Sequence, residues 1–179
     1  MASFSRKTLV KPFCSFLRTP RPRVLFKCNF NNTSDLIFFS APDWVLEDWT
    51  YRKVTSEVSI LKIKSPRRYR MRSRVMHLDT GDLGELYDYP YVAVYGYSDR
   101  IGLYDIENAK WLAYVSETVP EDTWLECELV RRDNVFEVWM NGVEKVEYTD
   151  PTPSYYGDFG YRVPGDYLAR FDNLEVEEI

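Results

Sequence analysis

Two pairs of glutamates stand at the spacing that acid catalysis on a β-strand would use. Glu126 and Glu128 lie in "TWLECELVRR", and Glu175 and Glu177 lie in "NLEVEE". Residues two apart on a strand point to the same face, and two carboxylates about 5 Å apart can perform retaining glycoside hydrolysis. The same spacing is typical of a solvent-facing row on a half-buried strand. We favour that second interpretation for both pairs.

The chain has a single histidine, His77, in "RVMHLDTGDLGE". Any Ser-His-Asp or Cys-His arrangement for nucleophilic catalysis would have to use it. It stands at the end of an alternating segment, where a structural role is more common. Because neither the histidine nor the glutamate pairs make a convincing catalytic set, the sequence predicts that the protein is not an enzyme.

The segment "DTGDLGELYD" concentrates acids and glycines. Asp79, Asp82 and Glu85 are the candidate ligands, because hard carboxylate oxygens in a flexible loop suit Ca²⁺. The spacing is not that of an EF-hand. The alternative, an acidic hairpin loop without metal, is favoured, and we expect no other cofactor.

Tyrosines alternate in "YDYPYVAVYGY". Those that share one face of a strand, and that we take as candidate ligand-binding residues, are Tyr89, Tyr91, Tyr95 and Tyr97. Val92 and Val94 then take the opposite face, which we expect in the core. Trp139, beside Glu137 on another strand, adds a mixed face. Such a tyrosine row can stack on sugar rings, anchor a protein interface or pack under a loop, and these three readings stay open.

A row of arginines alternates in "KIKSPRRYRMRSR". The four that line one face of a strand are Arg68, Arg70, Arg72 and Arg74. Like charges on one strand repel unless an anion faces them. The favoured partner is the Glu126 and Glu128 row on a neighbouring strand. Otherwise the row contacts an anionic glycan, phosphate or a partner's acidic patch.

These side chains must be positioned by strands, because helical periodicity is almost absent after residue 23. Segments with alternating apolar residues include Val24–Phe30, Glu57–Ser65, Arg67–Leu78, Tyr91–Ser98, Arg100–Ile106 and Lys110–Glu117. Asn141-Gly142 suits a type I′ hairpin turn. Ten or more short strands separated by turns predict an antiparallel sandwich or barrel.

The charge is divided unevenly along the 179 residues. The first 23 residues carry six basic side chains and no acid, whereas the whole chain has a net charge of −5. The basic residues of this predicted arm are Arg6, Lys7, Lys11, Arg18, Arg21 and Arg23. We predict two parts, an arm over 1–23 and a domain over 24–179. A basic arm is typical of docking onto an anionic partner, which includes nucleic acid.

The first 23 residues also bear on localisation. They do not resemble a secretory signal, because charge and proline interrupt their apolar stretches. Their serine and arginine content resembles an organellar transit peptide, which stays open as an alternative to a virion or intracellular location. No apolar run reaches the roughly 20 residues needed to span a bilayer. Cys14, Cys28 and Cys127 form no disulfide framework or zinc motif, and we expect them to be reduced.

The last third of the chain resembles the concanavalin A-like lectin/glucanase superfamily, which includes laminin-G-like jelly rolls. The carrying features are Trp124, "NVFEVWMNGVEKVEY", "GDFGYR" and "ARFDNLEVEE", in that order over residues 111–179. The resemblance implies an all-β antiparallel sandwich of two curved, facing sheets. Glucanases of this superfamily carry a Glu-x-Asp-x-x-Glu strand, which this sequence lacks. The fold alone does not decide between lectins, glycosidases, adhesion modules and viral coat parts.

The basic arm favours a structural component of a larger assembly, such as a viral capsid or decoration protein that contacts neighbouring subunits. The alternative is a lectin-like carbohydrate-binding module that uses the tyrosine-lined face. A glycoside hydrolase is the third hypothesis.

Overall fold

The protein folds into strands alone over the residues described by the structure, a computed structural model. These residues are 22–30, 44–47, 50–53, 58–64, 66–78, 83–96, 99–155 and 157–179, and they form two antiparallel sheets. The predicted all-β sandwich is therefore confirmed. None of the described segments is a helix long and apolar enough to cross a membrane. Of the basic residues of the arm, only Arg23 lies within the described residues, at the start of the first strand.

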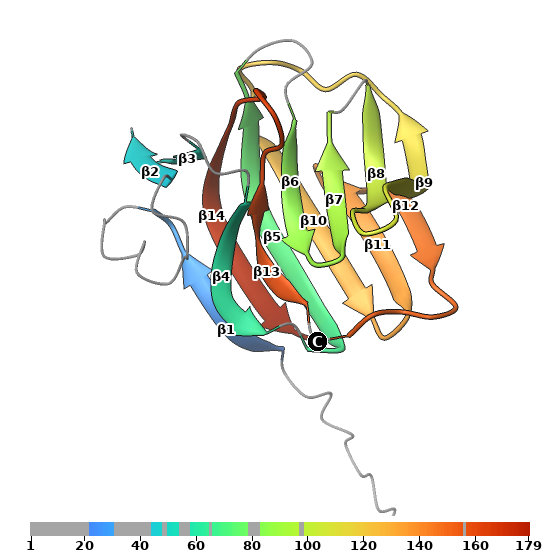
Figure 1. Ribbon diagram of the computed structural model, residues 1–179. Coiled ribbons are helices and arrows are strands. Elements are labelled where there is room, and N and C mark those ends of the chain that lie inside the picture. Colours follow the sequence, from blue (N-terminus) through green and yellow to red (C-terminus); the bar gives the residue numbers. More distant parts are fainter. Residues whose placement is uncertain are drawn as a thin grey trace, which may run out of the picture.

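The first sheet has six strands and lies in front in Figure 1. Its order across the sheet is β4 (Val58–Lys64), β13 (Asp158–Arg162), β6 (Gly84–Asp88), β7 (Tyr91–Tyr95), β8 (Arg100–Asp105) and β9 (Lys110–Ser116). Consecutive hairpins join the last four strands, which places their alternating side chains in register on a common face.

The second sheet has eight strands and lies behind the first (Figure 1). Its main path is β12 (Val143–Thr149), β11 (Val135–Met140), β10 (Leu125–Arg132), β5 (Arg68–His77), β14 (Ala169–Glu178), β3 (Thr50–Lys53) and β2 (Trp44–Glu47). The remaining strand, β1 (Arg23–Cys28), also pairs with β14. Asn141 and Gly142 join β11 to β12 with φ of 52° and 74°, as the predicted type I′ turn requires.

The core fills the space between the sheets with aromatic and aliphatic side chains. Tyr161 of β13 stacks on Phe171 of β14 with ring centroids 4.1 Å apart, and Tyr69 of β5 meets Phe159 of β13 edge-on at 4.7 Å. All four side chains are fully buried. Gly84 is required at the inner face of β6, because a Cβ there would lie 2.5 Å from a methyl group of Val75.

The tyrosine row of β7 lies on the inner face of its sheet, so the predicted assignment of faces is wrong. Tyr91 and Tyr95 are 2% and 0% exposed within the main core. The Tyr95 hydroxyl donates to the backbone carbonyl of Glu128 in the facing sheet at 2.8 Å. Val92 and Val94 instead point outward, into a separate small apolar cluster. The alternation was predicted correctly. The face was not, because the hydroxyls of Tyr91 and Tyr95 donate hydrogen bonds to Asp150 and to the Glu128 carbonyl, which lets both side chains be buried.

A buried ion pair joins the two sheets near the end of β6. Asp88 accepts hydrogen bonds from Arg131 of β10 at 3.3 Å and from the Tyr69 hydroxyl at 2.6 Å, and both charged side chains are fully buried. Burial, followed by the Asp88 charge, raises the pKa of Tyr69 well above its ordinary value. Arg131 also donates to the backbone carbonyls of Asp133 and Ser154. The pair is thus held by hydrogen bonds on several sides, as a buried charge must be.

Candidate functional site

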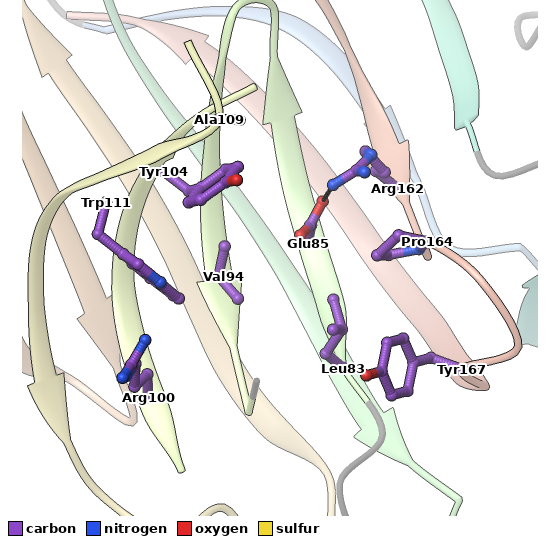
Figure 2. A pocket seen from close by; sticks show the side chains of 10 residues that line it. All are labelled: Leu83, Glu85, Val94, Arg100, Tyr104, Ala109, Trp111, Arg162, Pro164 and Tyr167. Atoms are coloured by element: carbon purple, nitrogen blue, oxygen red, sulfur yellow. Dashed lines mark hydrogen bonds and ion pairs between the residues drawn. The ribbon is translucent and has the colours of Figure 1, made fainter. Parts of the chain in front are cut away.

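An open groove of about 510 Å³ runs across the outer face of the six-stranded sheet (Figure 2). Strands β6, β7, β8, β9 and β13 and the β13–β14 connection all contribute to it. Its lining residues are Leu83, Glu85, Val94, Arg100, Tyr104, Ala109, Trp111, Arg162, Pro164 and Tyr167. The outward side chains of these strands share one face because alternate residues point the same way.

Aromatic side chains of β8 and β9 form one side of the groove. Tyr104 and Trp111 meet edge-on with ring centroids 5.4 Å apart. Tyr114, three residues further along β9 and 47% exposed, has its ring centroid 5.4 Å from that of Trp111, and the two residues flank an irregularity in the β8–β9 register. The Arg100 guanidinium lies 4.7 Å above the Tyr114 ring and 5.7 Å above the Trp111 ring. The result is a continuous aromatic surface with one cation resting on it.

Gly102 allows β8 and β9 to approach closely enough to build this aromatic side. A Cβ at this position would lie 2.2 Å from the Ala113 carbonyl oxygen and 2.7 Å from the Tyr114 backbone. Both contacts are with the neighbouring strand rather than with a flexible side chain. Any larger residue therefore has to displace β9, which carries Trp111.

A carboxylate and a guanidinium form the opposite side. Glu85 of β6 and Arg162 of β13 are direct cross-strand partners, and their side chains are joined at 2.7 Å. Glu85 is 4% exposed and Arg162 18% exposed. Figure 2 shows this pair across the groove from Trp111 and Tyr104, with Pro164 and Tyr167 beyond it. Polar groups therefore face an aromatic surface across a shared floor.

Apolar side chains make the floor. Leu83 and Val94 line it, and together with Val92 and Tyr87 they form the small outer cluster, against which Tyr167 packs. Burial, followed by the neighbouring Tyr89, raises the pKa of Tyr87 to about 12. Tyr87 belongs to this cluster and is not one of the residues that line the groove.

The predicted arginine row lies on the other sheet, and acids on both neighbouring strands balance it. Arg70 pairs with Glu128 of β10 at 3.4 Å and with Glu177 of β14 at 3.2 Å. The row's alternation and its pairing with Glu128 are confirmed, whereas the ion pairs of the described residues include neither Glu126 nor Arg68, and β14 supplies a second row of acids. Arg72 and Arg74 pair with acids of β14 in the same way. Ion pairing accounts for these arginines without any external anion.

The glutamate pairs considered for catalysis share that outer face of the eight-stranded sheet. Glu128, Glu175 and Glu177 are engaged with the arginine row. Trp139 also belongs to this second sheet, where its indole donates to Glu137 at 3.0 Å. None of these residues lines the groove.

Only one of the three proposed calcium ligands lies in the part of the chain that the structure describes. Asp79 and Asp82 lie outside the described residues, whereas Glu85 belongs to β6 and pairs with a cation. No cluster of three metal-ligating side chains occurs among the residues whose placement is described. His77 is buried at the end of β5 and does not line the groove.

Of the predicted tyrosines, Tyr89 is exposed in the β6–β7 turn and Tyr97 lies outside the described residues. The groove residues on β8, β9 and β13 were missed. The signal was present, since Arg100, Gly102 and Tyr104 alternate with the buried Ile101 and Leu103. The alternation alone did not show which of the two faces of the strand points to solvent.

The family comparison matches residues 35–177 to the model of the 3-keto-alpha-glucoside-1,2-lyase-like domain. The chain belongs to this family. No curated protein sequence matches. This family membership overturns the prediction that the protein is not an enzyme, because the family is described by a lyase activity.

Solved structures with the same fold cover most of the chain. The carbohydrate-binding module CBM66 from Bacillus subtilis is 16% identical, with a TM-score of 0.66 over 85% of this chain and 95% of that one. A galectin-like protein of unknown function from Bacillus subtilis is 13% identical, with a TM-score of 0.72 over 87% and 96%. A putative glycosyl hydrolase from Parabacteroides distasonis is 13% identical, with a TM-score of 0.60 over 86% and 88%.

These matches confirm the resemblance to concanavalin A-like jelly rolls. The chain is a jelly-roll module that is similar in fold to carbohydrate-binding and glycosyl-hydrolase-like proteins. Nothing in them supports the capsid or decoration role that the basic arm suggested. The lectin-like alternative fits better, although the tyrosine face that we assigned to it lies in the core.

Proposed function

We propose that the protein binds a saccharide in the groove on the outer face of the six-stranded sheet. The observation that carries this proposal is the juxtaposition of Trp111 and Tyr104 with the Glu85–Arg162 pair across one open groove. Sugars present apolar C–H faces and polar hydroxyl edges, so they need both kinds of surface at once. The groove volume of about 510 Å³ lies within the roughly 300–1,000 Å³ of small-molecule sites.

In this proposal the sugar ring rests on the indole of Trp111, whose neighbours Tyr104 and Tyr114 hold it at fixed angles. Glu85 accepts hydrogen bonds from hydroxyl groups, and Arg162 donates to ring or glycosidic oxygens. Because the Glu85 and Arg162 side chains already form an ion pair with each other, they lose little conformational entropy when the sugar binds.

A direct test measures affinity for a panel of oligosaccharides by isothermal titration calorimetry. We expect Trp111→Ala to weaken binding at least tenfold, because it removes the central stacking surface. Trp139→Ala is the matched control, a half-buried tryptophan on the opposite sheet, and should bind like the wild type. Binding that is lost in the Trp139 variant and kept in the Trp111 variant would refute the proposal.

A second candidate function adds chemistry at the same site, and Glu85 favours it as a buried carboxylate facing the groove. The family description implies elimination across C1 and C2 of a 3-keto glucoside. The C3 carbonyl acidifies the proton on C2. Glu85 would take the proton from C2, and the electrons of the C2–H bond would form the C1=C2 double bond. The C1 substituent would leave with the electrons of the C1–O bond. Arg162 would stabilise the negative charge that develops on the C3 oxygen.

The elimination is tested with an aryl 3-keto-α-glucoside, by following release of the aryl alcohol and the ultraviolet absorbance of the enone. Glu85→Gln should lower kcat at least 100-fold while the binding measured by calorimetry persists. Glu126→Gln, on the other sheet, is the control and should keep wild-type kcat. Unchanged turnover in Glu85→Gln would remove this assignment and leave the binding proposal standing.

A further inference from the structure

Arg100 is the cation of the groove for which the structure provides no acidic partner among its described residues. The groove is lined by two arginines and one glutamate, and Glu85 is engaged by Arg162. One positive charge therefore remains on the groove surface, although the whole chain carries a net charge of −5. A local excess of positive charge on an acidic protein favours an anionic ligand at that place.

Among the ion pairs of the described residues, no acid that adjoins Arg100 in the chain or in the sheet register is paired with it. Arg100 pairs in register with Ser116, the last residue of β9, and Glu117, which follows that strand, binds the Lys145 ammonium at 2.7 Å. Asp99, which precedes Arg100, occupies a turn position with φ of 56°. This contrasts with Arg70, Arg72 and Arg74, each of which pairs with acids of a neighbouring strand.

Aromatic rings, rather than a carboxylate, fix the Arg100 guanidinium. It lies 4.7 Å from the Tyr114 ring and 5.7 Å from the Trp111 ring. A guanidinium above a ring keeps the N–H groups of its edge available, and that edge matches the two oxygens of a carboxylate. Figure 2 shows Arg100 next to Trp111, the residue on which the proposed sugar rests.

We propose that the groove selects an acidic sugar, a hexuronate, whose carboxylate is bound by Arg100. This inference rests on the proposed saccharide binding and deepens it by naming the ligand class. The uronate ring lies on Trp111, and its C6 carboxylate forms a bidentate pair with the Arg100 guanidinium. The Glu85–Arg162 pair remains for the hydroxyl groups at the other side of the ring.

The test compares glucuronate- and galacturonate-containing oligosaccharides with neutral oligosaccharides of the same linkage and length. Calorimetry on the full chain gives the ratio of the two affinities. The wild type should prefer the acidic ligand at least tenfold, as a charge-assisted bidentate contact provides. Arg100→Gln should bring that ratio close to one, and Arg100→Lys should give an intermediate ratio, because lysine keeps the charge without the fork.

Arg68→Gln makes the same change in net charge at an exposed site on the other sheet and should keep the wild-type ratio. A wild-type ratio near one overturns the inference, as does a preference that survives in Arg100→Gln or a stronger preference for a sulfated neutral sugar. If neutral sugars bind through Trp111 without an acidic preference, the hexuronate inference is wrong and the proposed saccharide binding still holds. If no saccharide binds at all, the proposed function fails with it.

Discussion

Replacing Asp88 with asparagine should destabilise the protein by removing the buried countercharge of Arg131. Both side chains are fully buried, and the pair connects β6 of one sheet to β10 of the other. The Asp88→Asn variant keeps the size of the side chain and one acceptor oxygen. It leaves the arginine charge in a place that water cannot reach, and that is the costly part of the change.

The magnitude follows from what Arg131 retains. Breaking a buried ion pair from one side costs about 3–5 kcal/mol. Arg131 keeps its hydrogen bonds to the Asp133 and Ser154 carbonyls and its place over the rings of Tyr91, Phe136 and Tyr155. We therefore expect the lower end, about 3 kcal/mol, which for a chain of this size lowers Tm by roughly 6–12 °C.

Urea unfolding followed by tryptophan fluorescence measures the loss of free energy. The Tyr69→Phe variant is the control, since it removes one hydrogen bond to the same carboxylate but leaves Arg131 paired, and it should cost about 1.5 kcal/mol, the lower end for a hydrogen bond to a charged group. The double variant Asp88→Asn/Arg131→Met should lose less than the sum of its single variants, because it no longer buries an unpaired charge. A loss below about 1 kcal/mol for Asp88→Asn, or strict additivity, would show that the pair is not the constraint inferred from its burial.

Three further predictions concern the two faces of the six-stranded sheet. Tyr95→Phe should lower the free energy of unfolding by about 1 kcal/mol, because it removes the hydrogen bond from the Tyr95 hydroxyl to the Glu128 carbonyl, and calorimetry should find the saccharide affinity unchanged. Weakened binding would show that Tyr95 contacts the ligand. Gly102→Ala should lower both Tm and saccharide affinity, because its Cβ displaces β9 at the Ala113 carbonyl; wild-type values of both would contradict this. The raised pKa of Tyr87, about 12 against an ordinary 10, means that its stabilising contribution is complete below pH 10 and is lost as pH rises through 12. Tyrosinate absorbance during an alkaline titration should show an ionisation near pH 12 that is coupled to unfolding in the wild type and absent in Tyr87→Phe.

Strands such as β5, β11 and β12 could be predicted because their alternation is regular or because the turn that joins them carries specific residues. The segment Arg67–Leu78 corresponds to β5 at Arg68–His77, and Asn141-Gly142 makes the expected turn. Strand β6 was missed, because the glycines and acids of "DTGDLGELYD" resemble a loop. Its Gly84 is required by close packing against β5, a constraint that composition does not reveal.

The site was harder to predict because alternation divides residues into two faces without saying which face is inside. For β7 the choice depends on the facing sheet, where Glu128 and Asp150 accept the hydroxyls of Tyr95 and Tyr91. These partners lie more than thirty residues away in the sequence. Tyrosine is amphipathic, so its burial is decided by such long-range partners, whereas Val92 and Val94 fit an outer apolar cluster equally well.

The central claim, that saccharide binds at the groove over β8 and β9, is tested most directly by the indole N–H signals of the tryptophans. We would record ¹H–¹⁵N spectra of the full chain during titration with the tightest oligosaccharide of the panel, assigning Trp111, Trp124 and Trp139 by substitution. The account predicts that the Trp111 signal shifts with the calorimetric Kd, while Trp139 of β11 and Trp124, which directly precedes β10, keep their positions. A saturable shift of Trp139 or Trp124 with a stationary Trp111 would contradict it.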